Sequence, residues 1–196
     1  MCGPVDAVVL AAGLGRRMGG AKHLLRLEGK PLLAHVLGAL RGSRVRRTTV
    51  VLRVGDVAGQ ALSRELGAEA IWAEDPVEGR AASVRAGVRA TPGDVGGFLF
   101  AMADQPFLGS EDFDALIAAF QEGRSGIVHA SYAGARGTPV LLAAHYRDEL
   151  LSLRDRQGGR VLMARHPADV GGVALDPARG RDLDRPEDLP AGDTDS

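Results

Sequence analysis

Several features that mark particular classes of protein are scarce in this sequence. Its 196 residues include one cysteine, which excludes a disulfide framework and a thiolate cluster for zinc. The 24 Lys and Arg residues nearly balance the 25 Asp and Glu residues, so no overall basic field attracts nucleic acid. No window approaches 18 uninterrupted apolar residues, and residues 1–5 lack the pattern of a signal peptide. We therefore expect a soluble, cytoplasmic protein that binds neither membranes nor nucleic acid, and whose binding of phosphate would be local.

What the sequence does contain is an alternation of short apolar runs with segments of helical period. This pattern predicts one α/β domain over residues 1–189, three layers deep with a mostly parallel sheet, followed by a disordered tail at 190–196. The run around Pro139 is expected near a sheet edge, because proline lacks the amide donor that a central strand needs. The expected strands are 5–10, 48–54, 70–72, 97–102, 127–132, 139–142 and 170–175, and the expected helices are 32–40, 57–66, 81–89, 110–120, 145–153, 160–165 and a last turn from 186.

The first expected strand runs into a glycine-rich loop, DAVVLAAGLGRRMGGAKHLL at residues 6–25. Glycine lets a ligand approach the backbone, and the basic side chains of the loop favour an anionic ligand such as phosphate. The Walker pattern fails here because Lys22 is followed by His23 rather than Ser or Thr. The dinucleotide pattern fails because its third glycine would fall on Met18.

Five segments of the chain, in order, carry a resemblance to a known family. They are LAAGLGRRMGGAK (10–22), GKPLL (29–33), GRAASVRAGV (79–88), MADQPFL (102–108) and DLDRPEDL (182–189). With these segments the chain resembles the MobA-like NTP transferases, and most closely the molybdenum cofactor cytidylyltransferases. The resemblance implies a Rossmann-like nucleotidyltransferase domain that uses Mg²⁺.

The resemblance also implies a role for each site residue. Arg17, Lys22 and Asp104 would act in catalysis, with Arg17 or Arg16 on the leaving pyrophosphate and Lys22 on the α-phosphate. Magnesium would be held by Asp104 with Asp182 or Asp184. The nucleotide would be bound by Leu10, Ala11, Ala12, Gly13, Gly15, Arg16, Gly79 and Ser83.

Each of these residues also has a plain structural interpretation. Arg16, Arg17 and Lys22 are alternatively solvated cations of a loop, and Asp104 alternatively caps the turn before Gln105. Asp182, Asp184 and Asp188 alternatively form a solvated acidic face, and Ser83 alternatively serves only to start a helix. The five histidines show no pair at metal-ligand spacing, and His35 lies in an apolar helix where a satisfied core histidine is expected.

The resemblance implies transfer of CMP from CTP to the phosphate of a molybdopterin-type cofactor, with a molybdenum hydroxylase or its chaperone as partner. CTP is favoured because the methyl group of Ala12 narrows the pocket toward a pyrimidine. The chain departs from the family pattern at Thr138 and at 155–157, both implied to face the acceptor. The alternatives are a guanylyltransferase, transfer to another phosphorylated acceptor, a nicotinamide-dependent oxidoreductase, and a catalytically silent nucleotide-binding chaperone.

Overall fold

The computed structural model describes residues 3–13, 21–73, 79–155 and 157–183. The glycine loop at 14–20, the helical turn expected from residue 186 and the tail expected at 190–196 lie outside these ranges. None of the helices within them is long and apolar enough to cross a bilayer.

A seven-stranded sheet organises the molecule, with strand order β5-β4-β1-β6-β8-β7-β9. Four neighbouring pairs are parallel, and β8 runs antiparallel to both β6 and β7. This confirms the mostly parallel sheet. The strands are β1 Val5–Leu10, β4 Arg47–Leu52, β5 Glu69–Trp72, β6 Gly97–Met102, β7 Ile127–Tyr132, β8 Ala135–Ala143 and β9 Val170–Leu175, and a separate hairpin joins β2 Arg26–Leu27 to β3 Lys30–Pro31.

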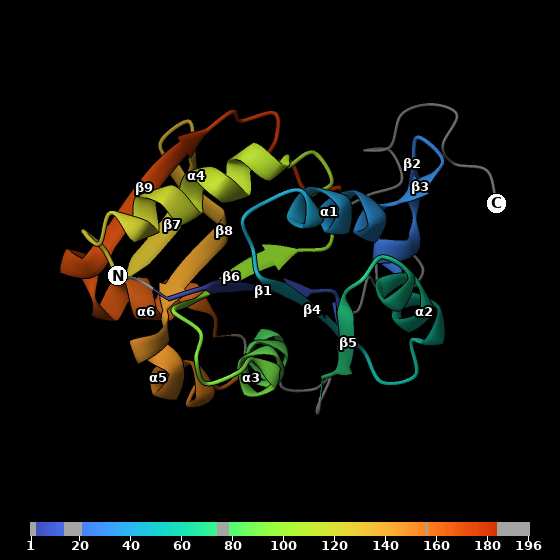
Figure 1. Ribbon diagram of the computed structural model, residues 1–196, viewed down its shortest axis with the longest axis horizontal. Helices are drawn as coiled ribbons and strands as arrows, with labels where there is room; N and C mark the ends of the chain where they lie inside the picture. The colour runs from blue at the N-terminus through green and yellow to red at the C-terminus, as the bar shows by residue number, and fades with distance from the viewer. Residues whose placement is uncertain (1–2, 14–20, 74–78, 156, 184–196) are drawn as a thin grey trace.

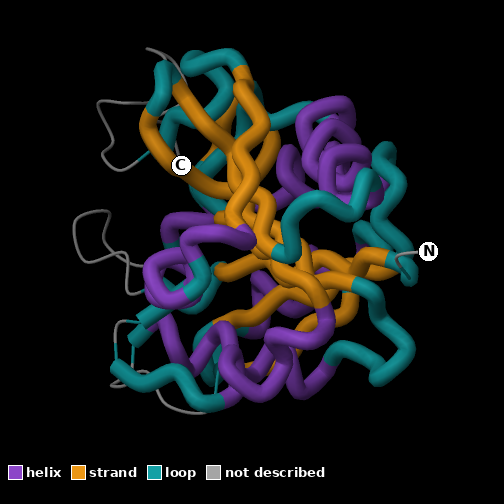
Figure 2. Tube along the Cα trace, turned by 90° about the vertical axis from the view of Figure 1, so that its left-hand side faces the viewer, coloured by secondary structure: helices purple, strands orange, loops and turns teal. Residues whose placement is uncertain are grey.

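Helices cover both faces of this sheet, which gives the expected three layers. Helices α1 and α4 pack on one face, and α3 and α5 lie together on the other (Figure 1). Figure 2 shows the twisted strands running through the middle of the molecule. The helices are α1 Leu32–Arg41, α2 Val57–Glu65, α3 Arg80–Ala90, α4 Ser110–Gln121, α5 Arg147–Leu151 and α6 Gly159–Arg165, with short 3₁₀ turns η2 Lys22–Leu24, η3 Ala144–Tyr146 and η4 Pro167–Asp169.

Strand β8 corrects one expectation, because the segment with Pro139 lies inside the sheet rather than at its edge. The pairing of β7 with β8 is interrupted between His129 and Ala130, where the partner jumps from Val140 to Gly137. Proline is tolerated at such an irregularity because no ladder hydrogen bond is required of its nitrogen. The prediction was wrong because a bulge, like an edge, is a position at which the missing amide donor of proline costs no hydrogen bond.

The central strands β1 and β6 are the most apolar and the most deeply buried part of the sheet. Every β1 residue except Leu10 and every β6 residue except Met102 is buried. The two exceptions pair with each other in the last register position, Leu10 with Met102. The loops that follow these two strands therefore leave the sheet side by side at its carboxyl edge, where open α/β sheets bind their ligands.

Candidate active site

The start of the glycine loop lies between the strands on either side of β1. The amide of Ala11 donates to the carbonyl of Val51 on β4 (2.9 Å), and the carbonyl of Leu10 accepts from the amide of Ala103 (3.3 Å). Ala11 is buried, Ala12 is half-buried and Gly13 is exposed. The chain thus emerges into solvent over the carboxyl edge. Gly15, Arg16 and Arg17 lie outside the described residues, so their expected roles stay predictions.

The structure brings together two predicted site residues that are 82 positions apart. Lys22, the first residue of η2, donates from Nζ to Oδ2 of Asp104 at 2.6 Å, and the two side chains are 14% and 20% exposed. Asp104 follows β6 directly, so the pair lies across the carboxyl ends of β1 and β6. The cation expected to bind phosphate and the carboxylate expected to bind metal are thereby next to each other in the described structure.

A third predicted residue, Asp182, is carried to the same place by the chain after β9. The amide of Leu183 donates to the carbonyl of Asp104 at 3.1 Å. Leu183 is fully buried in a small apolar cluster with Leu27 and Leu32, which ties this segment to β2 and α1. The side chain of Asp182 is exposed, one residue from that hydrogen bond. Asp184 lies outside the described residues.

Gln105 is a further residue of this edge, and it was not among the site residues predicted from the sequence. Its side chain is 3% exposed, accepts from the hydroxyl of Thr138 (2.8 Å) and donates to the carbonyl of Gly180 (3.2 Å). The hydroxyl of Tyr132 donates to the carbonyl of Thr138 (2.7 Å). Gln105 therefore joins β8 to the segment that carries Asp182. Thr138, a departure from the family pattern, lies within this network.

The carboxylate of Asp104 has the features of a cation ligand that is shared with substrate. Its Oδ1 atom is buried and has no hydrogen-bond partner in the described structure, and such an orphan is costly unless something binds it. No group of three or more His, Cys, Asp or Glu residues capable of holding a metal occurs in the described ranges. This donor set fits Mg²⁺ or a similar ion held by one or two carboxylates, with phosphates and water completing its shell.

Gly79 and Ser83 belong to α3, on the far side of the loop at 74–78. Gly79 caps this helix with φ +63°, a conformation that favours glycine, and Ser83 is 7% exposed. Because β5 is parallel to β1, the start of α3 follows a strand that ends at the carboxyl edge. This places the N-terminus of α3 at the same edge of the sheet as Asp104, the edge formed by the carboxyl ends of the parallel strands. The expected contacts of Gly79 and Ser83 with nucleotide stay predictions.

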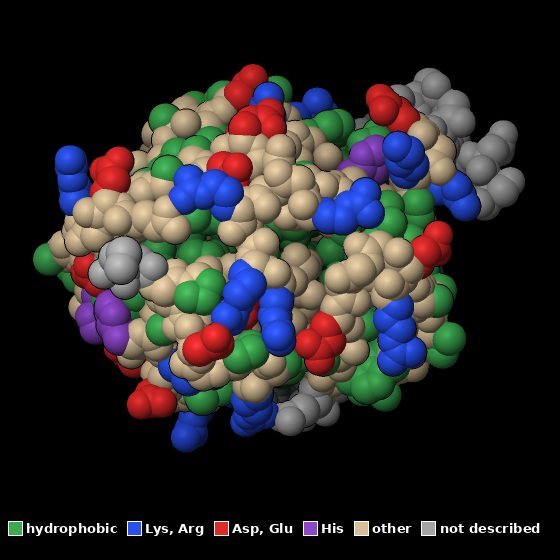
Figure 3. Space-filling view, in the orientation of Figure 1, with side chains coloured by type: hydrophobic (Ala, Val, Ile, Leu, Met, Phe, Trp, Pro, Cys, Tyr) green, Lys and Arg blue, Asp and Glu red, His purple; other side chains and the backbone are tan. Residues whose placement is uncertain are grey.

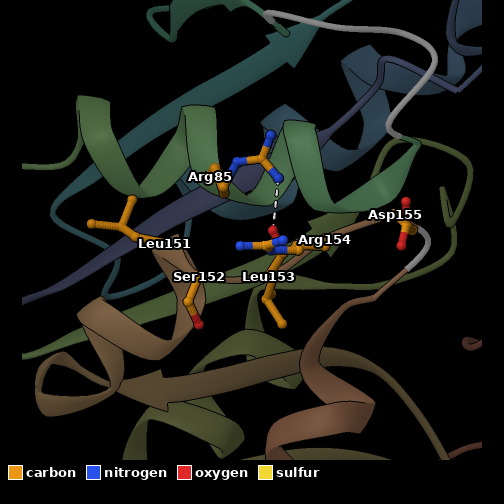
Figure 4. Close-up of a pocket in the computed structure, with 6 residues that line it drawn as sticks. All are labelled: Arg85, Leu151, Ser152, Leu153, Arg154 and Asp155. Carbon is orange, nitrogen blue, oxygen red and sulfur yellow. Dashed lines mark hydrogen bonds between the residues drawn. The ribbon is translucent and has the colours of Figure 1, made fainter.

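A cavity of about 490 Å³ lies beside α3, and none of the predicted site residues lines it. Figure 4 shows Arg85 reaching from α3 to the segment after α5, where a guanidinium nitrogen donates to the carbonyl of Leu153 (2.7 Å). The amide of Ala81 donates to the carbonyl of Asp155 (3.1 Å). Asp155, the first of the three residues at which the chain departs from the family pattern, is therefore held against the first turn of α3.

His23, the neighbour of Lys22, is a second residue that was not predicted to belong to the site, because no motif includes it. Its side chain is 7% exposed, and its Nε2 atom lies 2.7 Å from Oδ2 of Asp56. Burial lowers the pKa of the His23 imidazole below its usual value, and this effect outweighs the attraction to Asp56. His35, the expected core histidine, is half-buried and bonded to the carbonyl of Leu27 (2.8 Å).

Charge on the surface around these elements is mixed in sign. On the face drawn in Figure 3, Lys and Arg side chains alternate with Asp and Glu rather than gathering in one patch.

Comparison with curated proteins finds relatives that include a cytidylyltransferase and two proteins with other names. The chain is 37% identical over 132 residues to 2-C-methyl-D-erythritol 4-phosphate cytidylyltransferase of Streptomyces coelicolor, covering 63% of this chain and 48% of that protein. It is 34% identical over 128 residues to the bifunctional protein GlmU of Kineococcus radiotolerans, covering 63% and 26%. The purine catabolism protein PucB of Bacillus subtilis is 29% identical over 191 residues, covering 92% of both chains. The chain thus spans half or less of the first two relatives and nearly all of the third.

Solved structures share the fold at low sequence identity. Rv0371c of Mycobacterium tuberculosis superposes with a TM-score of 0.84 at 24% identity, covering 96% of both chains. A manganese complex of Rv0371c gives 0.79 at 22%, covering 94% and 95%. Molybdopterin-guanine dinucleotide biosynthesis protein A of Archaeoglobus fulgidus gives 0.67 at 23%, covering 94% of both.

The match that decides the family covers most of the sheet and the residues that meet at its carboxyl edge. Residues 7–170 match the MobA-like NTP transferase domain. That range includes the Lys22–Asp104 pair, Gly79, Ser83 and Thr138, and it ends before Asp182. The chain belongs to the family of MobA-like NTP transferase domains.

Proposed function

We propose that this protein is a divalent-cation-dependent nucleotidyltransferase that moves CMP from CTP to a phosphate of a molybdopterin-type molybdenum cofactor. The observation that carries the proposal is the 2.6 Å contact of Lys22 with Asp104, whose second carboxylate oxygen is buried and has no hydrogen-bond partner among the described residues. A cation and an incompletely bonded carboxylate at the end of a glycine loop suit a triphosphate and its metal ion.

The reaction would require mainly positioning and charge stabilisation from the protein. An oxygen of the acceptor phosphate forms a bond to the α-phosphorus, while the bond from that phosphorus to the bridging oxygen breaks. Pyrophosphate leaves with the electron pair. Lys22 would hold the α-phosphate, Arg16 and Arg17 the departing pyrophosphate, and the amides of the loop from Gly13 through Gly15 the β- and γ-phosphates.

Asp104 and Asp182 are proposed as the protein ligands of the cation, with Asp184 as the alternative to Asp182. A bound Mg²⁺ would supply neutralisation of the charge that builds on the phosphate oxygens. The manganese complex of Rv0371c supports a divalent ion, and we favour Mg²⁺ because it keeps water and substrate phosphates as most of its ligands. Binding of the cation would also give the buried Oδ1 atom of Asp104 the partner that it lacks.

The choice of CTP depends on the end of β1 and the start of α3. The half-buried Ala12 carries a methyl group where the loop begins, and this favours a pyrimidine over a purine. Gly79 and Ser83 are proposed to contact the nucleotide from the other side. The cytidylyltransferase of S. coelicolor, at 37% identity, supports the same base.

A second candidate acceptor is a phosphorylated compound other than a molybdopterin. The cytidylyltransferase of S. coelicolor is named for such a substrate, and Thr138 and the segment at 155–157 depart from the pattern expected for the first acceptor. The structure of the A. fulgidus protein supports the molybdopterin class, for which a molybdenum hydroxylase or its chaperone would receive the product. Labelled CTP offered with each acceptor in turn would separate the two.

The first test is a thermal-shift panel of CTP, GTP, ATP, UTP and NAD, each with and without Mg²⁺. A ligand at 100 times its dissociation constant adds about 2.7 kcal/mol to stability, which for a chain of this size raises the melting temperature by roughly 5–10 °C. We expect a Mg²⁺-dependent shift that is largest with CTP, together with release of pyrophosphate when acceptor is added. A shift with NAD alone would contradict the proposal, and binding of CTP without turnover on any acceptor would favour a silent nucleotide-binding protein.

A further inference from the structure

His23 is a buried ionisable residue for which the proposed mechanism has no use. It occupies the middle of η2, a single 3₁₀ turn that begins with Lys22. Its Nε2 atom lies 2.7 Å from Oδ2 of Asp56, and neither side chain is more than 13% exposed. A buried polar contact of this kind next to a proposed catalytic residue requires an explanation.

Within this contact, the Asp56 carboxylate is fixed by its own hydrogen bond to the backbone. The other carboxylate oxygen of Asp56 accepts from the amide of Gly59 (2.9 Å), which makes Asp56 the N-cap of α2. Gly59 is packed tightly against the pair, since a Cβ atom there would lie 2.8 Å from both His23 Nε2 and Asp56 Oδ2. The imidazole therefore meets a fixed surface made by the turn between β4 and α2.

A 3₁₀ turn directs successive side chains about 120° apart, because it has three residues per turn. Lys22 points to Asp104 after β6, whereas His23 points to Asp56 after β4. On its C-terminal side η2 is tied to α1 by the hydrogen bond from the Leu32 amide to the Leu25 carbonyl (2.8 Å). A turn of three residues has little stiffness of its own, so contacts of this kind determine where Lys22 stands.

From this geometry we infer that His23 is a positioning residue: its contact with Asp56 and Gly59 anchors η2 on the β4–α2 turn and thereby holds the ammonium group of Lys22 at the reacting phosphate. The inference rests on the proposed function, because it assigns His23 a part in the same reaction. His23 touches neither substrate nor metal in this account. Its effect on the reaction passes through Lys22.

The test is a double-mutant cycle on CMP transfer with Mg²⁺, using His23→Leu, Lys22→Met and the two together. Loss of positioning would lower kcat of His23→Leu roughly tenfold, with KM for CTP changed less than about threefold, because the Lys22 contact strengthens in the transition state. In the Lys22→Met background His23→Leu should lower kcat less than about twofold, since residues that act as a unit are not additive. His23→Gln, which keeps a polar group for Asp56, should recover part of the lost kcat.

Two matched controls separate positioning from a general loss of structure. His129 on β7 is buried to the same degree, at 7% exposed, so His129→Gln tests the cost of replacing a buried histidine elsewhere and should leave kcat unchanged. Gly59→Ala introduces a methyl group into the His23 contact and should lower kcat as His23→Leu does. Gly38→Ala on α1, where a Cβ atom meets nothing within 4 Å, should not.

The outcomes distinguish the inference from the function on which it rests. Additive losses in the cycle, or an unchanged kcat for His23→Leu, in an active wild-type enzyme would overturn the role of His23 alone. A wild-type protein that binds CTP yet transfers CMP to no acceptor would overturn the proposed function and this role with it. Coupled losses that Gly59→Ala reproduces and Gly38→Ala does not would establish the anchor.

Discussion

Asp6 and Asp104 lie near opposite ends of adjacent central strands and differ sharply in how their oxygens are used. Asp6, at the amino end of β1, is 3% exposed and accepts two hydrogen bonds of 2.8 Å from Arg46, one on each oxygen. Arg46 also donates to Asp94, and these contacts raise the pKa of its guanidinium. Asp104, at the carboxyl end of β6, has one oxygen bonded to Lys22, and within the part of the chain that the structure describes its other oxygen is buried without a hydrogen-bond partner.

A second carboxylate of the amino edge resembles Asp6. At the amino edge, Asp169 accepts from the amide of Gly126 (2.7 Å) and the hydroxyl of Tyr146 (2.6 Å), and these hydrogen bonds lower its pKa despite burial. A carboxylate whose hydrogen-bonding capacity is used within the protein contributes to stability. A carboxylate with a buried oxygen that makes no hydrogen bond lowers the stability of the fold, but that oxygen is available to bind a ligand. Asp6 and Asp169 at the amino edge thus stabilise the fold, whereas Asp104 at the carboxyl edge belongs to the proposed chemistry.

The largest effect is expected from Asp104→Asn. This change should lower the rate of CMP transfer by at least about a hundredfold, because the proposed cation loses its negatively charged ligand. The melting temperature should move by less than about 3 °C, since the asparagine oxygen still accepts from Lys22. Turnover with Mg²⁺ and a thermal melt of the same preparation check both expectations. Full activity in this variant would remove the metal assignment.

Asp6→Asn should show the reverse pattern. Loss of the negative charge weakens two charge-assisted hydrogen bonds from Arg46 and should lower the melting temperature by roughly 5 °C. The kcat of the folded enzyme should stay the same, because Asp6 lies at the far end of β1 from the loop. A fall in kcat at a temperature well below the melt would mean that the two edges are not separate in function.

Acid should weaken the carboxyl edge through His23. Burial lowers the pKa of this imidazole below its ordinary value of 6.5, so the unfolded chain takes up the proton first. This contribution to stability is complete above pH 6.5 and is lost as the pH falls from there through the folded-state pKa. Facing His23 are Asp56, which raises its pKa, and Arg53, which lowers it. The urea midpoint should fall between pH 7.5 and pH 5.5 in the wild-type protein, and it should fall less in His23→Gln. An equal fall in the two proteins would assign the pH effect to another group.

The smallest effect is expected from an exposed ion pair at the amino edge. Arg165 lies 3.4 Å from Glu149, and the side chains are 49% and 35% exposed. Such pairs contribute about 0–1 kcal/mol, so Arg165→Gln should change the urea midpoint little and kcat not at all. A larger loss would show that the amino edge depends on its exposed charges as well as on the buried hydrogen bonds of Asp6 and Asp169.

Much of the fold was predictable because its strands are short runs dominated by apolar residues, without any interruption in β6. The bounds of β1, β6, β7 and β9 agree with those expected from the sequence. The hairpin of β2 and β3 was not predicted, since strands of two residues are too short to show a period. The internal place of β8 was missed because the sequence does not reveal a bulge.

The candidate site was predictable only in part, and for a different reason. The Lys22–Asp104 contact agrees with the family resemblance, which selected both residues without local evidence that they meet. His23 and Asp56 are 33 positions apart and have no shared motif, so their contact depends on how η2 and α2 pack. The position of Asp182 could have been inferred from Leu183, because an apolar residue in an otherwise polar segment indicates that the segment packs against the core.

The burial of Leu183 against Leu27 and Leu32 also bears on when the protein becomes competent during its synthesis. The site spans nearly the whole chain, from the loop after β1 to a segment made 173 residues after Leu10. During synthesis the carboxyl edge stays incomplete until residue 183 has emerged from the ribosome. The proposed nucleotide site would thus be complete only in chains whose translation has passed this point.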